Sequence, residues 1–171
     1  MGPPWPGFFA EKAALQLARA SRCQEIMDTY GLPTPARVGP EVASDFWVLV
    51  QHADEAVDLQ VQVLDAIERG PADAYDPAER AYLTDRVRIN TGRPQLFGTQ
   101  MDYDNKVGRA YPKPLEDPAN VDQRRTGAGM EPLLDYVNGV CEMHFQMNRA
   151  GYVEKGVLTA YQYPQDFNAW E

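Results

Sequence analysis

Apolar residues recur at helical spacing along most of the chain, and clusters of Gly and Pro separate the segments that carry this pattern. The first segment, residues 8–30, has the pattern of an amphipathic helix. A connector rich in Pro and Gly, residues 31–41, follows it. A second and longer helix is predicted from about Pro40 to Arg69, where "RGPAD" ends it.

The start of a third helix has the clearest local signal. Asp76 suits the N-cap, Pro77 the first helical position, and Glu79 the third position, where its carboxylate would complete a reciprocal capping box. The helix should end near residues 90–92, "NTG".

One segment has the pattern of an antiparallel β-hairpin. "QLFGTQM" and "VGRAYPKPL" flank the turn-forming "DYDNK", which predicts a hairpin near residues 95–115. In a strand, Gln95, Phe97 and Thr99 would lie on one face. Gly98 in mid-strand is unfavourable unless another backbone or a ligand approaches closely, so this strand is a candidate side of a binding pocket.

The rest of the chain is predicted to be helical up to an aromatic tail. A short helix begins at Asp117 and Pro118, "TGAG" breaks it, and residues 131–151 form the last long helix. The fold class is therefore mainly α: a single-domain, helical bundle-like fold with one small antiparallel β-hairpin. The expected parts are a flexible lead-in at residues 1–7, a helical domain at residues 8–150, and an extension at residues 151–171 that packs on the body or forms an interface.

Charge and composition argue against several kinds of partner. The 171 residues include 16 Lys and Arg against 25 Asp and Glu, a formal charge of −9, with no basic cluster for nucleic acid or an anionic membrane. No window approaches the ~18 apolar residues of a membrane span, and no targeting segment is expected. Cys23 and Cys141 are far apart and few for a secreted disulfide scaffold, which favours the cytoplasm.

The reactive residues argue against several mechanisms. Neither serine lies in a Gly-x-Ser-x-Gly motif and no phosphate-binding loop is present, so a serine hydrolase and a nucleotide cofactor are not expected. Cys23, His52, Cys141 and His144 could form a metal site only if distant helices converge, which is a weak signal. We therefore expect no metal and no cofactor.

Polar side chains share one face of the predicted second helix. Trp47, Gln51, Asp54 and Asp58 follow the spacing i, i+4, i+7, i+11, with His52 beside them. An imidazole next to carboxylates is suited to proton transfer near neutral pH. The alternative is that the polar groups cap backbone groups and that His52 is a surface residue or a satisfied core residue.

A similar choice applies to Tyr82, Asp85 and Arg86 on the third helix. An Asp beside an Arg is most often a structural ion pair between helices. In the functional alternative, Arg86 binds an anionic substrate group while Asp85 or Asp54 transfers a proton. The segment "VDQRRTGAGMEP" likewise allows either a C-cap with a loop or an anion site on the amides of the next helix.

Several motifs in a fixed order resemble a bacterial family of unknown function, DUF6624. They are "LPTPARVGPEVASDFWVLVQHADEAVDLQ", "AYLTDRVRINTGRPQLFGTQ", "LEDPANVDQRR" and "MEPLLDYV", within about residues 30–137. The resemblance implies recurring polar positions at Gln51, His52, Asp54, Gln60, Tyr82, Asp85, Arg86, Gln95, Thr99, Gln100, Arg124 and Arg125. Phe97 stands where the family pattern has Tyr, and the chain beyond about Cys141 extends past the shared motifs.

The leading hypothesis is a small enzyme, independent of metal and nucleotide, that uses acid/base groups on a polar, anionic small molecule. Its reaction would be hydrolysis, elimination, isomerisation, or ring closure with loss of a leaving group. The candidate catalytic residues are His52, Asp54 and Asp85, and the candidate substrate-binding residues are Trp47, Gln51, Tyr82, Arg86, Gln95, Thr99, Gln100, Arg124 and Arg125. The resemblance suggests bacterial specialised metabolism as the setting.

The alternative function is a non-catalytic binding or partner-regulating module. In that case the polar residues would form a network between helices, and the tail "AYQYPQDFNAW" would contact a protein partner or a second copy of the chain.

Overall fold

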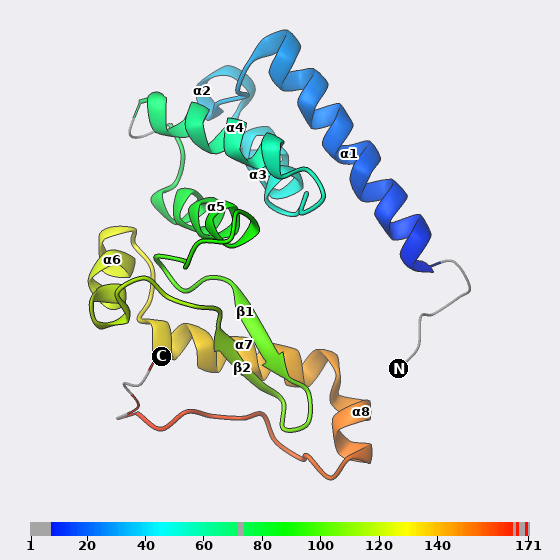
Figure 1. The fold of residues 1–171 in the computed structure, drawn as a ribbon, viewed down its shortest axis with the longest axis vertical. Helices are drawn as coiled ribbons and strands as arrows, with labels where there is room; N and C mark the ends of the chain where they lie inside the picture. The colour runs from blue at the N-terminus through cyan, green and yellow to red at the C-terminus, as the bar shows by residue number, and fades with distance from the viewer. Residues whose placement is uncertain (1–7, 72–73, 166, 168–169, 171) are drawn as a thin grey trace. The chain divides into compact units, whose positions relative to one another are not determined.

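The computed structural model describes residues 8–71, 74–165, 167 and 170, so the predicted lead-in at residues 1–7 lies outside the described residues. The chain divides into two compact units, residues 1–92 and 93–171. Helices predominate and one small antiparallel sheet is present, which confirms the predicted mainly α fold class (Figure 1). Among the described residues, no helix is both long enough and apolar enough to cross a membrane.

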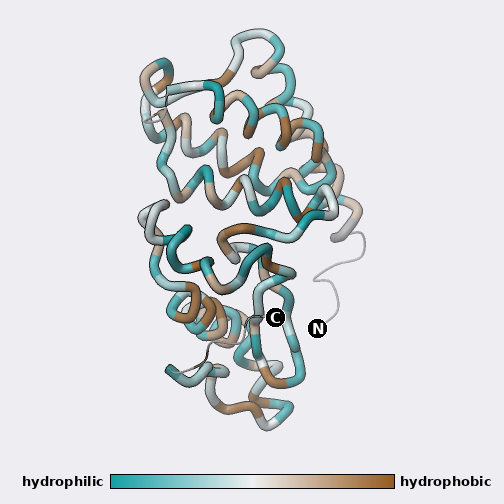
Figure 2. Tube along the Cα trace, turned by 60° about the vertical axis from the view of Figure 1, so that its left-hand side comes forward, coloured by the Kyte–Doolittle hydropathy of each residue, from teal (hydrophilic) through white to brown (hydrophobic). Residues whose placement is uncertain are grey.

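Helices of the first unit pack around one hydrophobic core. They are α1 (Phe8–Tyr30), α2 (Pro35–Val38), α3 (Pro40–Gln51), α4 (Val57–Arg69) and α5 (Pro77–Asn90). Cys23, Phe46, Val50, Val63 and Leu83 are among the buried side chains of this core. Figure 2 shows hydrophobic and hydrophilic positions alternating along the helices, as expected when one side of each helix is buried.

The prediction of one continuous second helix is wrong, because this segment forms two helices separated by a turn. Helix α3 ends at Gln51 and α4 begins at Val57. The Gln60 side-chain amide in α4 donates to the last carbonyls of α3, with Nε2 3.2 Å from Val50 O and 3.3 Å from Gln51 O. The last carbonyls of a helix lack partners within it. A side chain from the next helix therefore caps α3 where the sequence has neither Gly nor Pro.

This turn also removes the helical face on which the sequence placed four polar or aromatic residues. Trp47 and Gln51 lie on α3, Asp54 lies in the turn, and Asp58 lies in the first turn of α4. The spacing i, i+4, i+7, i+11 therefore does not describe one continuous face.

Helix α5 begins where the sequence predicted, at Pro77. The Asp76 carboxylate accepts a hydrogen bond from Ala78 N at 2.7 Å, which confirms Asp76 as the N-cap. Glu79 does not complete the predicted capping box. Its carboxylate instead accepts a hydrogen bond from the Ser44 hydroxyl at 2.9 Å. Glu79 thus connects α5 to α3.

The second unit combines the hairpin with one long helix and several short ones. Its elements are β1 (Met101–Asp104), β2 (Arg109–Pro112), the 3-10 helix η1 (Pro118–Asn120), α6 (Val121–Gly127), α7 (Leu133–Met147) and α8 (Arg149–Glu154). The hairpin is confirmed, but its first strand starts later than predicted and its turn is residues 105–108. The predicted last helix is interrupted at Asn148. Buried side chains of this unit's core include Ala110, Val121 and Cys141.

The segment of residues 95–100 is not the strand that the sequence predicted. Gly98 has φ +72°, a left-handed conformation that breaks the alternation of an extended chain. A Cβ at this position would lie 2.7 Å from Leu133 Cδ1. The close approach that requires a glycine here is therefore made by a core leucine of the same unit. The predicted shared face of Gln95, Phe97 and Thr99 is wrong for the same reason.

Candidate functional site

The turn between α3 and α4 holds a carboxylate that two side chains of α5 orient. Arg86 Nη1 lies 3.1 Å from Asp54 Oδ1 and 3.2 Å from Oδ2, and Asn90 Nδ2 lies 3.1 Å from Oδ1. Arg86 and Asn90 are four residues apart and so share one face of the helix. The Asp54 side chain keeps 50% of its exposure, whereas Arg86 keeps 19%. The carboxylate is therefore fixed in direction and still reachable from solvent.

Gln60 connects this carboxylate to the end of α3. Its side chain is completely buried, and its Oε1 accepts from Asn90 Nδ2 at 2.9 Å while its amide nitrogen caps α3. One asparagine thus donates to both Asp54 and Gln60. Asn90 was not among the predicted site residues, although its spacing of four residues from Arg86 could have identified it.

His52 follows α3 directly and is its C-cap residue. The pKa of its imidazole is lowered from the ordinary value, first because partial burial disfavours the charged ring and then because Arg86 is near. Asp54 acts in the opposite direction and favours the charged ring. A histidine in this setting is neutral at neutral pH and has a ring nitrogen free of its proton, as a general base requires.

The same imidazole lines a small cleft within the first unit. This cleft has a volume of about 180 Å³ and is lined by Gln16 and Arg19 of α1, by Val48 and Leu49 of α3, and by His52 and Ala53. Arg19 makes no ion pair with any residue that the structure describes. The cleft thus places a proton acceptor and a cation on one small, partly apolar surface.

The other predicted site residues of the first unit take different places. Asp85 is completely buried in α5, and Gln51 is buried at the end of α3. Trp47 packs against the hydrophobic core, and Tyr82 is half-buried. Of the predicted residues in this unit, the structure brings His52, Asp54 and Arg86 together. Trp47 contributes to the core.

In the second unit, Gln95 binds the main chain on both sides of the hairpin. Its Nε2 donates to Gln100 O at 2.9 Å and to Lys113 O at 2.8 Å, and its Oε1 accepts from Gln100 N at 2.8 Å. The Gln100 side chain in turn donates to Thr99 Oγ1 at 2.9 Å. Gln95, Thr99 and Gln100 are all buried, and these hydrogen bonds fix the conformation of residues 95–100.

Arg124 and Arg125 also bind backbone carbonyls of that segment. Arg124 Nε donates to Leu96 O at 2.7 Å, and Arg125 Nη1 donates to Phe97 O at 2.7 Å. The Arg125 guanidinium further lies 4.8 Å from the centre of the Tyr136 ring. These contacts hold the loop before β1 in place, a structural role for two residues that were predicted to bind substrate.

The predicted anion site at the start of α7 already has an anion from the chain itself. Asp122 Oδ1 accepts a hydrogen bond from Leu133 N at 2.7 Å. A carboxylate at this position satisfies an amide that the helix leaves without a partner.

A comparison with protein families agrees with the resemblance that the sequence motifs indicated. The model of a family of unknown function, DUF6624, matches residues 3–147. The chain belongs to the DUF6624 family. The match extends beyond the motifs at both ends and leaves residues 148–171 of this DUF6624 member outside it. No curated protein and no solved structure was found to match the chain.

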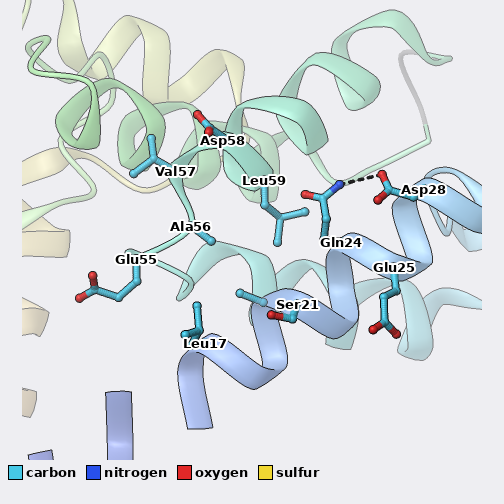
Figure 3. A pocket seen from close by; sticks show the side chains of 11 residues that line it. Leu17, Ser21, Gln24, Glu25, Asp28, Glu55, Ala56, Val57, Asp58 and Leu59 are labelled. Carbon is cyan, nitrogen blue, oxygen red and sulfur yellow. Dashed lines mark hydrogen bonds between the residues drawn. The ribbon is translucent and has the colours of Figure 1, made fainter. Parts of the chain in front are cut away.

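A second and larger hollow in the first unit has a different character. It is a groove of about 600 Å³ between α1 and residues 55–59 (Figure 3). Leu17, Ala56 and Leu59 give it apolar surface, and four carboxylates line it: Glu25, Asp28, Glu55 and Asp58. Gln24 donates to Asp28 at 2.8 Å and to Gln62 of α4 at 2.8 Å. The groove is thus acidic, in contrast to the cleft that Arg19 lines.

Cys23, His52, Cys141 and His144 were the residues considered for a metal site. No three His, Cys, Asp or Glu side chains among the residues that the structure describes are grouped closely enough to hold a metal ion. Cys23 and Cys141 are both free and buried, each in the core of its own unit.

Proposed function

We propose that this DUF6624 member is a small enzyme that transfers protons on a polar, anionic small molecule. The reaction would be a hydrolysis, an elimination, an isomerisation, or a ring closure with loss of a leaving group. The observation that carries the proposal is the position of His52, an imidazole with a lowered pKa at the edge of a cleft that Arg19 also lines.

His52 is the proposed general base. It accepts a proton from the substrate as a neutral imidazole and becomes a cation in doing so. Asp54 favours the charged ring, and Arg86 and Asn90 hold its carboxylate in one direction. The Asp54 carboxylate would therefore stabilise the imidazolium as it forms, which is the established use of an aspartate near a catalytic histidine.

Arg19 is the proposed anchor for the anionic group of the substrate. A guanidinium can bind a carboxylate or a phosphate through two parallel hydrogen bonds. In a chain of net charge −9, a cation without an ion pair among the described residues is a local feature that would select an anion. Base, counter-ion and anchor are all side chains, so the proposed chemistry uses neither metal nor nucleotide.

The setting of the proposed enzyme is the cytoplasm. Two free cysteines buried in separate cores, Cys23 and Cys141, support a reducing compartment. A bacterial source and a place in specialised metabolism are further parts of the proposal, and both rest on the family resemblance alone.

The test is conversion of small anions by the purified protein. A mixture of carboxylated and phosphorylated metabolites is incubated with the wild type and with His52→Gln, and the products are followed by mass spectrometry. Arg19→Gln should weaken substrate binding, and Arg22→Gln is its matched control, because Arg22 lies on the same helix, is exposed and pairs with Glu25. Conversion that persists unchanged in His52→Gln would contradict the assignment of the base.

A second candidate function is the binding of a protein partner, and the acidic groove favours it. The four carboxylates and the apolar surface in Figure 3 complement a basic, amphipathic helix. Titration with a Lys-rich amphipathic peptide tests this candidate, with Glu55→Gln and Asp58→Asn as the variants that should weaken binding. Equal affinity for the double variant and the wild type would exclude the groove as the contact.

A further inference from the structure

The segment after α8 packs onto the second unit through specific bonds. Asn138 Oδ1 of α7 accepts from Tyr163 N at 2.8 Å, and the Tyr163 hydroxyl donates to Ala110 O of β2 at 2.9 Å. Tyr163 is buried, and Figure 1 shows the segment in orange and red returning along this unit. Of the two readings of the aromatic tail, the structure favours packing on the body. The segment also lies beyond the residues that the family model matches.

Two aromatic rings near the end of this segment are held by Tyr163. The Phe167 and Trp170 rings lie 4.8 Å apart in a T-shaped pair, at 4.6 Å and 5.3 Å respectively from the Tyr163 ring. Both are only half-buried, so each ring keeps part of its surface open. The π-face of an aromatic ring carries negative partial charge and attracts cations.

These rings line a cavity of about 490 Å³ together with two carboxylates. Asp122 has one oxygen bound to Leu133 N, which fixes the direction of its side chain. Asp135 is exposed and makes no hydrogen bond or ion pair with any residue that the structure describes. The remaining lining residues are apolar or uncharged, and none is Lys or Arg: Pro118, Ala119, Val121, Pro132, Leu134 and Gln165.

We propose that this cavity binds an organic ammonium ion. Phe167 and Trp170 would contact its alkyl groups and its charge, and Asp135 would supply the opposite charge, with Asp122 as a second carboxylate. Aromatic rings with a carboxylate are the combination that recognises quaternary ammonium groups in proteins. The two rings lie beyond the residues that the family model matches, whereas Asp122 and Asp135 lie within them. This cavity shares no lining residue with the proposed acid/base cleft, so an experiment can contradict one of the two proposals and leave the other standing.

The experiment compares choline with its uncharged isostere 3,3-dimethyl-1-butanol, by calorimetric titration of the full chain. Choline should bind at least about tenfold more tightly, since the two molecules differ in charge and hardly in shape. Asp135→Asn and Trp170→Ala should each weaken choline binding by about tenfold. Asp45→Asn, at an exposed position of α3, is the matched control and should leave the affinity unchanged.

Three results would overturn the proposal. Equal affinity for choline and its isostere would show an apolar cavity without selection for charge. Choline binding that survives Asp135→Asn and Trp170→Ala would place the cation elsewhere on the acidic chain. No binding of choline, tetramethylammonium or spermidine would remove the ammonium site, and circular dichroism of each variant separates these results from unfolding.

Discussion

Replacing Gln60 by Met should destabilise the first unit through the loss of one helix cap. Gln60 is completely buried, and Met has nearly the same length without the amide. The Val50 carbonyl keeps its bond from Ala53 N at 3.0 Å, so the substitution mainly deprives Gln51 O of a partner. Asn90 loses one of its two bonds. An unsatisfied buried carbonyl together with one lost hydrogen bond costs about 2–4 kcal/mol.

Thermal unfolding followed by circular dichroism measures this effect. For a chain of this size the loss corresponds to a fall in Tm of about 5–15 °C. The matched control is Gln62→Met, because Gln62 lies two residues further along α4 and is exposed. Among the described residues, its side chain bonds only to the half-buried Gln24. Gln62→Met should change Tm by no more than about 2 °C. Equal changes in the two variants would refute the claim that a side chain caps α3.

Three further predictions concern other positions. Gly98→Ala should lower the free energy of unfolding by about 1–3 kcal/mol more than Gly129→Ala in urea titrations, because both glycines have positive φ but a Cβ at Gly98 would contact Leu133. Asp76→Ala should cost about 1 kcal/mol in the same assay through loss of the N-cap, and an unchanged free energy of unfolding would contradict this role of Asp76. Burial lowers the pKa of His144, so its contribution to stability is complete above the ordinary value of ~6.5 and falls as the pH drops below it; His144→Gln should reduce the stability lost between about pH 7.5 and about pH 5.5, and an unchanged loss would contradict this.

The sequence predicted those features that depend on neighbouring residues. Asp76 and Pro77 mark the start of α5 because a cap and a fixed φ act within one helical turn. The hairpin was predicted from its turn and its alternating residues, although its first strand starts at Met101, where the left-handed turn at Gly98 has ended.

Features that depend on residues far apart in the sequence could not be predicted in the same way. The end of α3 is capped by Gln60, which lies in the next helix. Residues 52–56 contain neither Gly nor Pro, so the sequence has no local signal for a break there. Arg124 and Arg125 bind backbone carbonyls about 28 residues earlier in the chain. The sequence does not show which carbonyls the fold brings next to them. Of the predicted site residues, the structure brings His52, Asp54 and Arg86 together. His52 and Asp54, however, lie in the turn between α3 and α4 and not on one continuous helix.

The measurement that most directly tests the proposed site is an NMR titration of the histidine rings. The chain has two histidines, so His144→Gln assigns the signal of His52 without further labelling. We predict that His52 titrates below the ordinary histidine value of ~6.5, and that inorganic phosphate raises its pKa in the wild type but not in Arg19→Gln. An ordinary pKa for His52 that phosphate leaves unchanged would contradict a neutral base beside an anion site.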